Sequence, residues 1–155
     1  RLFFLLAVLL VAASSFANDF EEGLDAIHGT DYDKALEKLR PLASEGHAAA
    51  QYNLGVMHEW GNGLPQDNVK AMKWYRISAE QSHRDAQNNL GAMYSKGEGV
   101  AQNFVEALKW FVVSADNGSE GGRKNIDIVE KRMTSRQITQ AKKLAREWIK
   151  QHPKK

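Results

Sequence analysis

The sequence predicts an all-α solenoid, in which pairs of antiparallel helices stack on one another. The main observation is a 36-residue unit written twice, at residues 50–85 and 86–121, with fifteen identical positions where about two are expected by chance. The second observation is that each unit holds two stretches with apolar residues at helical spacing. This combination is typical of stacked helix pairs, because a single pair cannot bury its apolar face alone.

The first helix of each unit has a narrow apolar stripe. In the first copy Ala50, Leu54 and Met57 recur at i, i+4 and i+7, which places them on one side of a helix. Gly55 lies beside that stripe, at about 100° from Leu54. Its missing side chain predicts the close approach of a neighbouring helix, which outweighs the roughly 1 kcal/mol cost of glycine in a helix.

A glycine turn leads into the second helix of the unit. Gly61, Gly63 and Pro65 end the first helix and reverse the chain. The second helix is expected to pack through small and aromatic side chains. Its predicted inward stripe comprises Ala71, Trp74, Tyr75 and Ser78.

These positions resemble the Sel-1-like repeat, a relative of the tetratricopeptide repeat. The shared frame is Ala-x-x-x-Leu-Gly from Ala50, Gly-x-Gly-Val from Gly97 and Lys-Ala-x-x-Trp-Tyr from Lys70. The resemblance covers about residues 20–148. Two departures, which we interpret as packing changes, are His58 in place of a tyrosine and a serine in place of an alanine at Ser78 and Ser114.

The resemblance implies a right-handed superhelix and a function without chemistry. It implies a non-catalytic protein–protein interaction module, acting as adaptor, scaffold or regulator in the bacterial cell envelope. The alternative is a cell-wall or β-lactam-acting hydrolase, as suggested for the cysteine-rich branch of the family. This chain lacks both the cysteines and a Ser-x-x-Lys pair, which favours the interaction module.

Residues 1–17 have the form of a secretory signal peptide. An uncharged apolar run covers residues 2–13, with Arg1 before it and Ser15-Phe16-Ala17 after it. The run is too short to span a bilayer, which takes about 20 residues. We therefore expect cleavage after Ala17, an exported and periplasmic protein, and no membrane span after processing. A buried N-terminal helix is the alternative.

Residues 18–49 are predicted to form a degenerate first helix pair. Phe20, Leu24 and Ile27 recur at i, i+4 and i+7, as in the first helix of the full units. Pro41 should kink or interrupt the second helix of this pair, because it removes one backbone donor.

Residues 122–150 are predicted to form a degenerate half-repeat with a basic capping helix, followed by a tail at residues 151–155. Ile126 falls 36 positions after Leu90, so the repeat register continues. The four residues from Thr134 have the form of a capping box, which starts the last helix. A terminal helix with one polar face is what a solenoid needs to seal its exposed core.

The charge of the chain is unevenly spread along the sequence. Residues 18–122 contain 9 Lys and Arg against 16 Asp and Glu, a balance of −7, whereas residues 123–155 contain 11 against 3, a balance of +8. A solvated basic cap on an acidic body is the simpler interpretation. The alternative is that the basic C-terminal helix contacts an anionic surface or an acidic partner. Nucleic acid is not an expected partner of an exported protein.

The sequence has no pattern typical of catalysis or of metal binding. It contains no cysteine, which excludes disulfides, thiolate metal ligands and cysteine nucleophiles. His47 and His83 occupy one position in successive units, so we interpret both as structural. All four tryptophans are expected in the core or the cap, although Trp60 has no counterpart in the second copy. No catalytic residue, metal ion or cofactor is predicted.

The candidate binding surface is the side of each first helix that faces away from the apolar stripe. Apart from the identical Asn53 and Asn89 at its border, its residues differ between the two copies while the core positions agree, as expected where packing fixes only the core. This side should line a concave groove that holds a peptide or protein segment, with Tyr52 as its main anchor; a merely solvated face is the alternative. The predicted partner-binding residues are Tyr52, Asn53, Val56, Glu59, Asn88, Asn89, Ala92 and Ser95.

Overall fold

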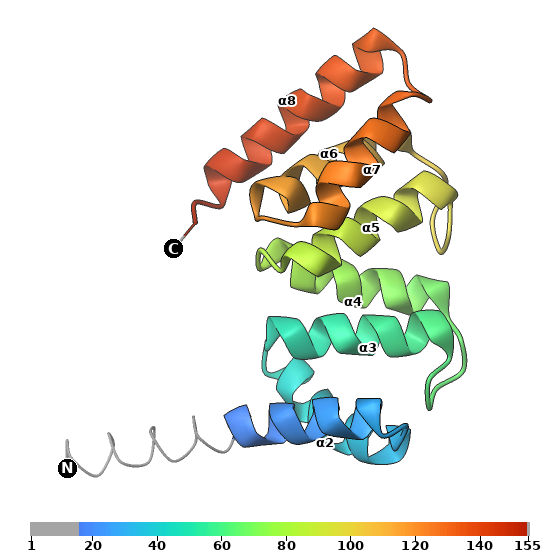
Figure 1. The fold of residues 1–155 in the computed structure, drawn as a ribbon, viewed down its shortest axis with the longest axis vertical. Coiled ribbons are helices and arrows are strands. Elements are labelled where there is room, and N and C mark those ends of the chain that lie inside the picture. The colour runs from blue at the N-terminus through green and yellow to red at the C-terminus, as the bar shows by residue number, and fades with distance from the viewer. Residues whose placement is uncertain (1–15, 155) are drawn as a thin grey trace, which may run out of the picture.

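The computed structural model describes residues 16–154, and every regular element within them is a helix. Residues 16–28 form a first helix, which is followed by α2 (Tyr32–Ser44), α3 (Ala48–Trp60), α4 (Asn68–Glu80), α5 (Arg84–Lys96), α6 (Phe104–Asp116), α7 (Glu120–Glu130) and α8 (Ser135–Gln151). From α2 to α7 each helix packs against the next, and the last helix, α8, packs against α6 (Figure 1). The predicted all-α solenoid is confirmed.

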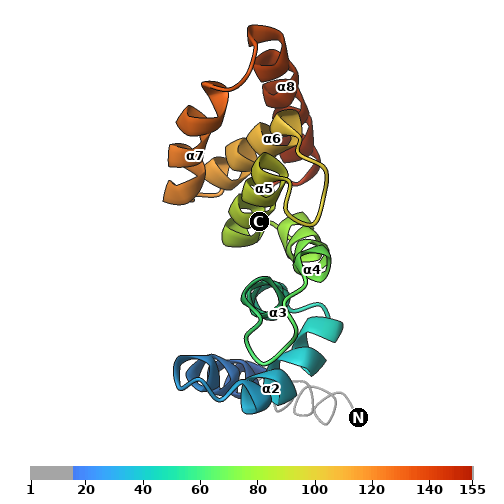
Figure 2. The ribbon, with the colours of Figure 1, turned by 90° about the vertical axis from the view of Figure 1, so that its right-hand side faces the viewer.

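The helices form two rows. Besides its neighbours in sequence, α5 contacts α7 and α6 contacts α8. From α5 to α8, therefore, first helix contacts first helix and second helix contacts second helix. Figure 2 shows α7 reaching to one side of the stack, while α4, α6 and α8 lie toward the other. The candidate groove belongs to the row of α3, α5 and α7.

Buried glutamines tie each unit to the unit before it. The side-chain amides of Gln51 and Gln87 each donate a hydrogen bond of 3.0 Å, to the carbonyl oxygens of Ala43 and Ala79 respectively. Both acceptors lie in the last turn of a second helix, where backbone carbonyls lack intrahelical partners. The repeated glutamine of the sequence frame is therefore an inter-unit link.

One serine in each full unit joins the two helices of that unit. The hydroxyl of Ser78 donates to the carbonyl oxygen of Ala48 at 2.7 Å, and that of Ser114 donates to Arg84 at 2.8 Å. Each bond fixes the start of a first helix to the last turns of the second. The serines that replace alanine are thus more than the packing change expected from the sequence, because each adds a hydrogen bond.

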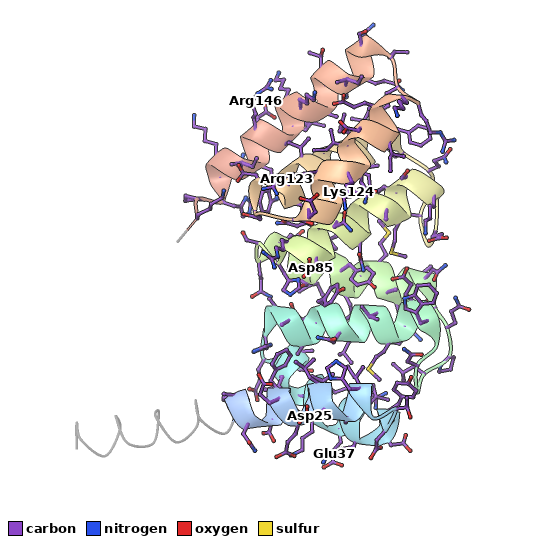
Figure 3. The ribbon with its side chains drawn as sticks, in the orientation of Figure 1. Asp25, Glu37, Asp85, Arg123, Lys124 and Arg146 are labelled. Atoms are coloured by element: carbon purple, nitrogen blue, oxygen red, sulfur yellow. The ribbon has the colours of Figure 1, made fainter. Side chains whose placement is uncertain are left out.

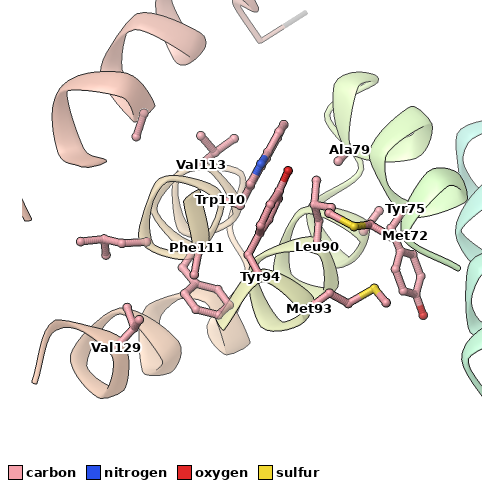
Figure 4. Close-up of a cluster of buried hydrophobic side chains, with 14 of the residues drawn as sticks. Met72, Tyr75, Ala79, Leu90, Met93, Tyr94, Trp110, Phe111, Val113 and Val129 are labelled. Carbon is pink, nitrogen blue, oxygen red and sulfur yellow. The ribbon is translucent and has the colours of Figure 1, made fainter. Parts of the chain in front are cut away.

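The core of the second unit and the cap is continuous from α4 to α8. Figure 4 shows Tyr75, Leu90 and Phe111 stacked in succession within it, with Val129 of α7 beyond them. The predicted inward stripe of α4 holds only in part at Trp74. Met72 is buried in α4, whereas Trp74 is half-buried and packs against a second core cluster, formed by the first helix, α2 and α3.

The helical glycines allow close approach of the second helix, as predicted. A Cβ atom at Gly55 would lie 2.6 Å from ring atoms of Tyr75, and one at Gly91 would lie 2.8 Å from the ring of Phe111. A side chain at either position would have to displace a buried aromatic ring.

The N-terminal pair differs from the prediction at Pro41. The α2 helix continues through Pro41 to Ser44 without a break, so the expected interruption is wrong. Pro41 removes only its own bond to the carbonyl of Glu37, and its carbonyl oxygen still accepts from the Glu45 amide at 3.0 Å, so the helix runs on past it. The predicted signal peptide falls almost entirely outside the described residues; only Phe16 and Ala17 are described, as part of the first helix.

The α8 helix closes the C-terminal end. The predicted capping box is present: the Gln137 amide donates to the Thr134 hydroxyl at 3.3 Å, and the Thr134 amide donates to the Gln137 side chain at 2.9 Å. Ala141 and Ala145 are completely buried. No helix within residues 16–154 has the length and apolar character required to cross a membrane.

Candidate functional site

The candidate groove is built from equivalent positions of α3, α5 and α7, spaced 36 residues apart. One position holds Tyr52, Asn88 and Lys124, and the next, one turn further along, holds Val56, Ala92 and Ile128. All eight predicted binding residues are half-buried. The structure distributes them between two local clusters, one at the junction of α3 and α5 and the other between α5 and α7.

Tyr52 and Glu59 belong to an aromatic cluster at the junction of α3 and α5. The Tyr52 ring stacks on His83, with 4.9 Å between ring centroids, and lies 5.8 Å from the Tyr75 ring. The hydroxyl of Tyr75 donates a hydrogen bond to the carboxylate of Glu59. Burial raises the pKa of Tyr75 far above its usual range, and the hydrogen bond to Glu59 adds to the rise. Tyr75 therefore stays a neutral donor that positions Glu59 at the groove.

The same surroundings act on the hydroxyl of Tyr52. Burial raises the pKa of Tyr52, and the nearby carboxylates of Asp85 and Glu59 raise it further, while the Asn89 side chain opposes the rise. Asn53 lies at the edge of this cluster and donates to the carbonyl oxygen of Ala49 at 2.8 Å. Tyr52 is thus partly a packing residue that holds α3 to α5, and is less available as an anchor than the sequence predicts.

The second cluster surrounds a hollow between α5 and α7. Asn125 donates to the side-chain oxygen of Asn88 at 2.9 Å, which joins the two helices at one end of the groove. Beyond this bond lies a hollow of about 180 Å³. Its lining residues are Ala92, Ser95, Lys96, Phe111, Asn125, Ile128 and Val129.

Comparison with known proteins places this architecture in a family. Residues 48–83 and 84–119 match the model of the Sel1 repeat. A Sel1 repeat protein from Oxalobacter formigenes has a similar structure, with a TM-score of 0.67 and 32% identity over 79% of this chain and 96% of that chain. The chain belongs to the Sel1 repeat family. The matched Sel1 repeats begin two residues before those read from the sequence.

A longer Sel1-like solenoid is also similar. It is a protective antigen present in uropathogenic Escherichia coli strains that displays an SLR fold, with a TM-score of 0.82 and 33% identity over 87% of this chain and 30% of that chain. This chain therefore spans less than a third of the antigen's length. A search of curated proteins gave no match. Sel1 repeats generally form non-enzymatic protein-binding scaffolds, so the family indicates an interaction module.

Two residues on the groove side were missed by sequence reasoning, one in the first Sel1 repeat and one in α7, which follows the second repeat. Trp60 and Ile128 are 69% and 60% exposed, the highest values among the large apolar side chains of residues 16–154. The expectation that all four tryptophans are buried is therefore wrong for Trp60. Trp60 follows Val56 by four residues, so it extends the groove side of α3. The signal available in the sequence was that Trp60 has no counterpart in the second repeat.

The repeated histidines cap the first helices, as the structural interpretation predicts. The Nδ1 atom of His47 accepts a hydrogen bond from the Ala50 amide at 3.1 Å, and that of His83 accepts one from Ala86 at 3.3 Å. Only an unprotonated Nδ1 can accept such a bond. Burial is the main cause that lowers the pKa of His83, so the fold favours its neutral ring.

His58 is a second half-buried histidine whose neutral ring the fold favours. Its Nδ1 atom is buried without a hydrogen-bond partner among the described residues. Burial lowers the pKa of His58, and the cation of Lys70 lowers it further.

We expect this pair of histidines to make the Sel1 repeats less stable in acid. Because both folded-state pKa values lie below the unfolded value of about 6.5, the stabilisation is present above that pH and is lost as the pH falls through the folded pKa values. Melting temperature should therefore be flat above neutrality and should fall below it. His83→Asn keeps an acceptor at the cap without a titrating ring, and should flatten the decline.

The matched control for this measurement is His28→Asn, because His28 is exposed. It should leave the dependence of melting temperature on pH as in the wild type. A His83→Asn curve parallel to the wild-type curve would contradict the role given to His83.

The described part of the chain offers no cluster for a metal. No group of three or more His, Asp or Glu side chains in residues 16–154 is placed to hold a metal ion. What the groove offers chemically is apolar contact at Trp60 and Ile128, with hydrogen bonding from Glu59, Asn89 and Ser95.

Proposed function

We propose that the chain is a non-catalytic interaction module of the bacterial cell envelope, an adaptor, scaffold or regulator that holds a partner protein segment along α3, α5 and α7. The observation that carries the proposal is the exposure of Trp60 and Ile128 on the groove side. Large exposed apolar groups cost little to a solvated scaffold but stabilise a complex when a partner removes them from water. Tryptophan is also enriched among the residues that dominate binding energy.

The repeat pattern supports the same surface. Positions that pack between the repeats are the same in both copies, such as Leu54 and Leu90, while the groove positions change from Tyr52 to Asn88 and from Glu59 to Ser95. Local packing accounts for part of these differences, because Tyr52 stacks on His83 and Glu59 accepts a hydrogen bond from Tyr75. All four side chains are nevertheless half-buried, so each leaves some surface for a ligand. A surface that varies along a constant scaffold is suited to one extended ligand with different side chains at each step.

The groove is tested by a paired set of alanine variants. Trp60→Ala with Ile128→Ala removes the exposed apolar groups of the groove, whereas Val69→Ala with Ile77→Ala removes matched exposed groups of α4 in the other row. Proteins crosslinked to the chain in envelope extract are quantified for both variants. A loss of about 2 kcal/mol at a binding hot spot predicts about thirtyfold weaker capture by the groove variant.

The α4 variant should capture the same proteins as the wild type. Both variants should melt close to the wild-type temperature, because exposed side chains contribute little to stability. Equal capture by the groove variant and the wild type would place the binding surface elsewhere on the molecule. Turnover of a chromogenic β-lactam that a single substitution abolishes would favour the hydrolase alternative, for which the described residues supply no observation.

Export to the periplasm is part of the proposal, and its expected result is a mature chain that begins at Asn18. Phe20, whose ring lies 4.6 Å from that of His47, remains after this cleavage, so the N-terminal packing is kept. Mass spectrometry of the periplasmic fraction should give this N-terminus, without lipid. Ala17→Glu, which spoils the small residue before the cut, should accumulate uncleaved. A mature protein that retains residues 1–17 would contradict export by this route.

A further inference from the structure

The outer side of α8 carries a row of cations. Arg136, Lys143 and Lys150 are seven residues apart, which places them in line and about 10 Å from one another along the helix. All three are exposed, as is Arg146 beside them. The opposite side of α8 is fixed to the core by two completely buried alanines, Ala141 and Ala145, so the row faces away from the solenoid. The helix contains five Lys and Arg and one acidic residue, a balance of +4.

Most of these cations have no ion-pair partner in the part of the chain that the structure describes. Arg136, Arg146 and Lys150 take part in no ion pair among residues 16–154, and Lys143 reaches only Glu147, at 3.9 Å. A shallow hollow runs along the first half of the row. Its lining residues are Ser135, Arg136, Thr139, Gln140 and Lys143.

The other end of the solenoid is acidic. Residues 16–45, which form the first helix and α2, contain eight Asp and Glu against three Lys and Arg, a balance of −5. Asp19 and Glu22 are held by Lys38 at 2.8 and 3.1 Å. Other acidic residues are exposed and take part in no ion pair among the described residues. They include two sets that lie one helical turn apart, Glu21 with Asp25 and Asp33 with Glu37.

The two charged surfaces lie at opposite ends of the molecule. Figure 3 shows Asp25 and Glu37 at the end formed by the first two helices, and Arg146 on α8 at the other end. The helices between them, residues 48–130, contain eight Lys and Arg against ten Asp and Glu, a balance of only −2. The charge separation is therefore along the long axis, and the ends of two copies are complementary.

We propose that copies of this chain associate head to tail, with the acidic first helix pair of one copy against the basic α8 row of the next. Because the contact joins two different surfaces, an assembly always keeps one acidic end and one basic end unoccupied. Further copies can therefore add at either end, which gives open chains. The contact is governed by exposed charges, which are screened over about 10 Å at 0.1 M salt. Association is therefore strong only at low ionic strength.

A second copy fits the row better than a lipid surface does. None of the exposed large apolar side chains in residues 16–154 lies on α8, so this helix has no group to insert among acyl chains. The acidic counterpart, in contrast, is on the same chain and is present at the same concentration. This inference is independent of the groove, because it uses neither α3, α5 nor α7.

Sedimentation velocity of the purified chain tests the proposal. At about 20 mM salt the mean sedimentation coefficient should rise with protein concentration, and at about 300 mM salt it should fall to that of the monomer, because the Debye length shrinks. A constant monomer value at both salt concentrations would overturn the proposal. Association that persists or strengthens at high salt would also overturn it, because such association comes from apolar contacts.

Charge reversal at each end identifies the surfaces. Asp25→Lys with Glu37→Lys changes the balance of residues 16–45 from −5 to −1, and Lys143→Glu with Arg146→Glu changes the balance of α8 from +4 to 0. A mixture of the two variants still pairs an unchanged acidic end with an unchanged basic row. Each variant alone should associate at least about tenfold more weakly than the wild type at low salt, while an equimolar mixture of the two should regain association. The four residues are exposed, so circular dichroism should show wild-type melting.

The mixture separates this contact from other uses of the basic row. Failure of the mixture to associate, with both variants folded, would overturn the proposal. Binding of the wild type to phosphatidylglycerol vesicles, lost on Lys143→Glu with Arg146→Glu while self-association is absent, would assign the row to a lipid surface instead.

Discussion

Trp110→Ala is expected to lower the free energy of unfolding by about 3–5 kcal/mol, the usual cost of replacing a buried aromatic ring by a cavity. Trp110 is 4% exposed and its ring meets the edge of Trp148, with 5.6 Å between centroids. The substitution therefore also loosens α8, which carries Trp148. A domain of this size has about 5–15 kcal/mol in all, so the variant should melt at least about 10 °C below the wild type.

Two other tryptophans supply matched controls for this measurement. Trp74→Ala should cost less, because the half-buried Trp74 leaves a smaller cavity. Trp60→Ala should change stability by no more than about 0.5 kcal/mol, because the side chain is 69% exposed. An unchanged melting temperature for Trp110→Ala would mean that the contact with Trp148 does not hold α8 in place.

The comparison of Trp74 with Trp110 shows what a repeat pattern can and cannot predict. The 36-residue period correctly placed the helices and the close approach at Gly55, since both depend on packing inside one unit. Burial of a repeated tryptophan depends on what stacks over it. Trp110 is covered by Trp148 of α8, whereas Trp74 packs against the cluster formed by the first helix, α2 and α3, and the period does not predict this difference.

The groove was predicted less completely for a similar reason. The angular position around α3 correctly put Tyr52 and Val56 on a partly exposed side, but it could not show that Tyr52 stacks on His83 of the next unit. Tyr52→Ala would disturb this junction as well as the groove, so it does not separate binding from folding. Trp60 was grouped with the other tryptophans in the core or the cap although it has no counterpart in the second copy, and only the structure shows that it is exposed at the end of α3.

Gly99→Ala is the second substitution with a large expected effect. Gly99 has φ of +71°, a left-handed conformation that costs a residue with a Cβ atom about 1–3 kcal/mol. Its added Cβ would also lie 2.6 Å from the carbonyl carbon of Asn68 and 3.0 Å from the amide nitrogen of Val69. These are backbone atoms at the start of α4 in the preceding unit, which cannot rotate away. Overpacking of this kind costs a further 1–3 kcal/mol or so.

Gly46→Ala separates the two contributions to that loss. Gly46 also has a positive φ, of +97°, but a Cβ atom there would meet nothing within 4 Å. Chemical denaturation of both variants should therefore show a larger loss of unfolding free energy for Gly99→Ala, by about the 1–3 kcal/mol assigned to overpacking. Equal losses of unfolding free energy would mean that the second Gly-x-Gly turn requires glycine only because its backbone is left-handed. A larger loss at Gly99 would show that this turn also holds consecutive units at their stacking distance, on which the alignment of α3 with α5 in the groove depends.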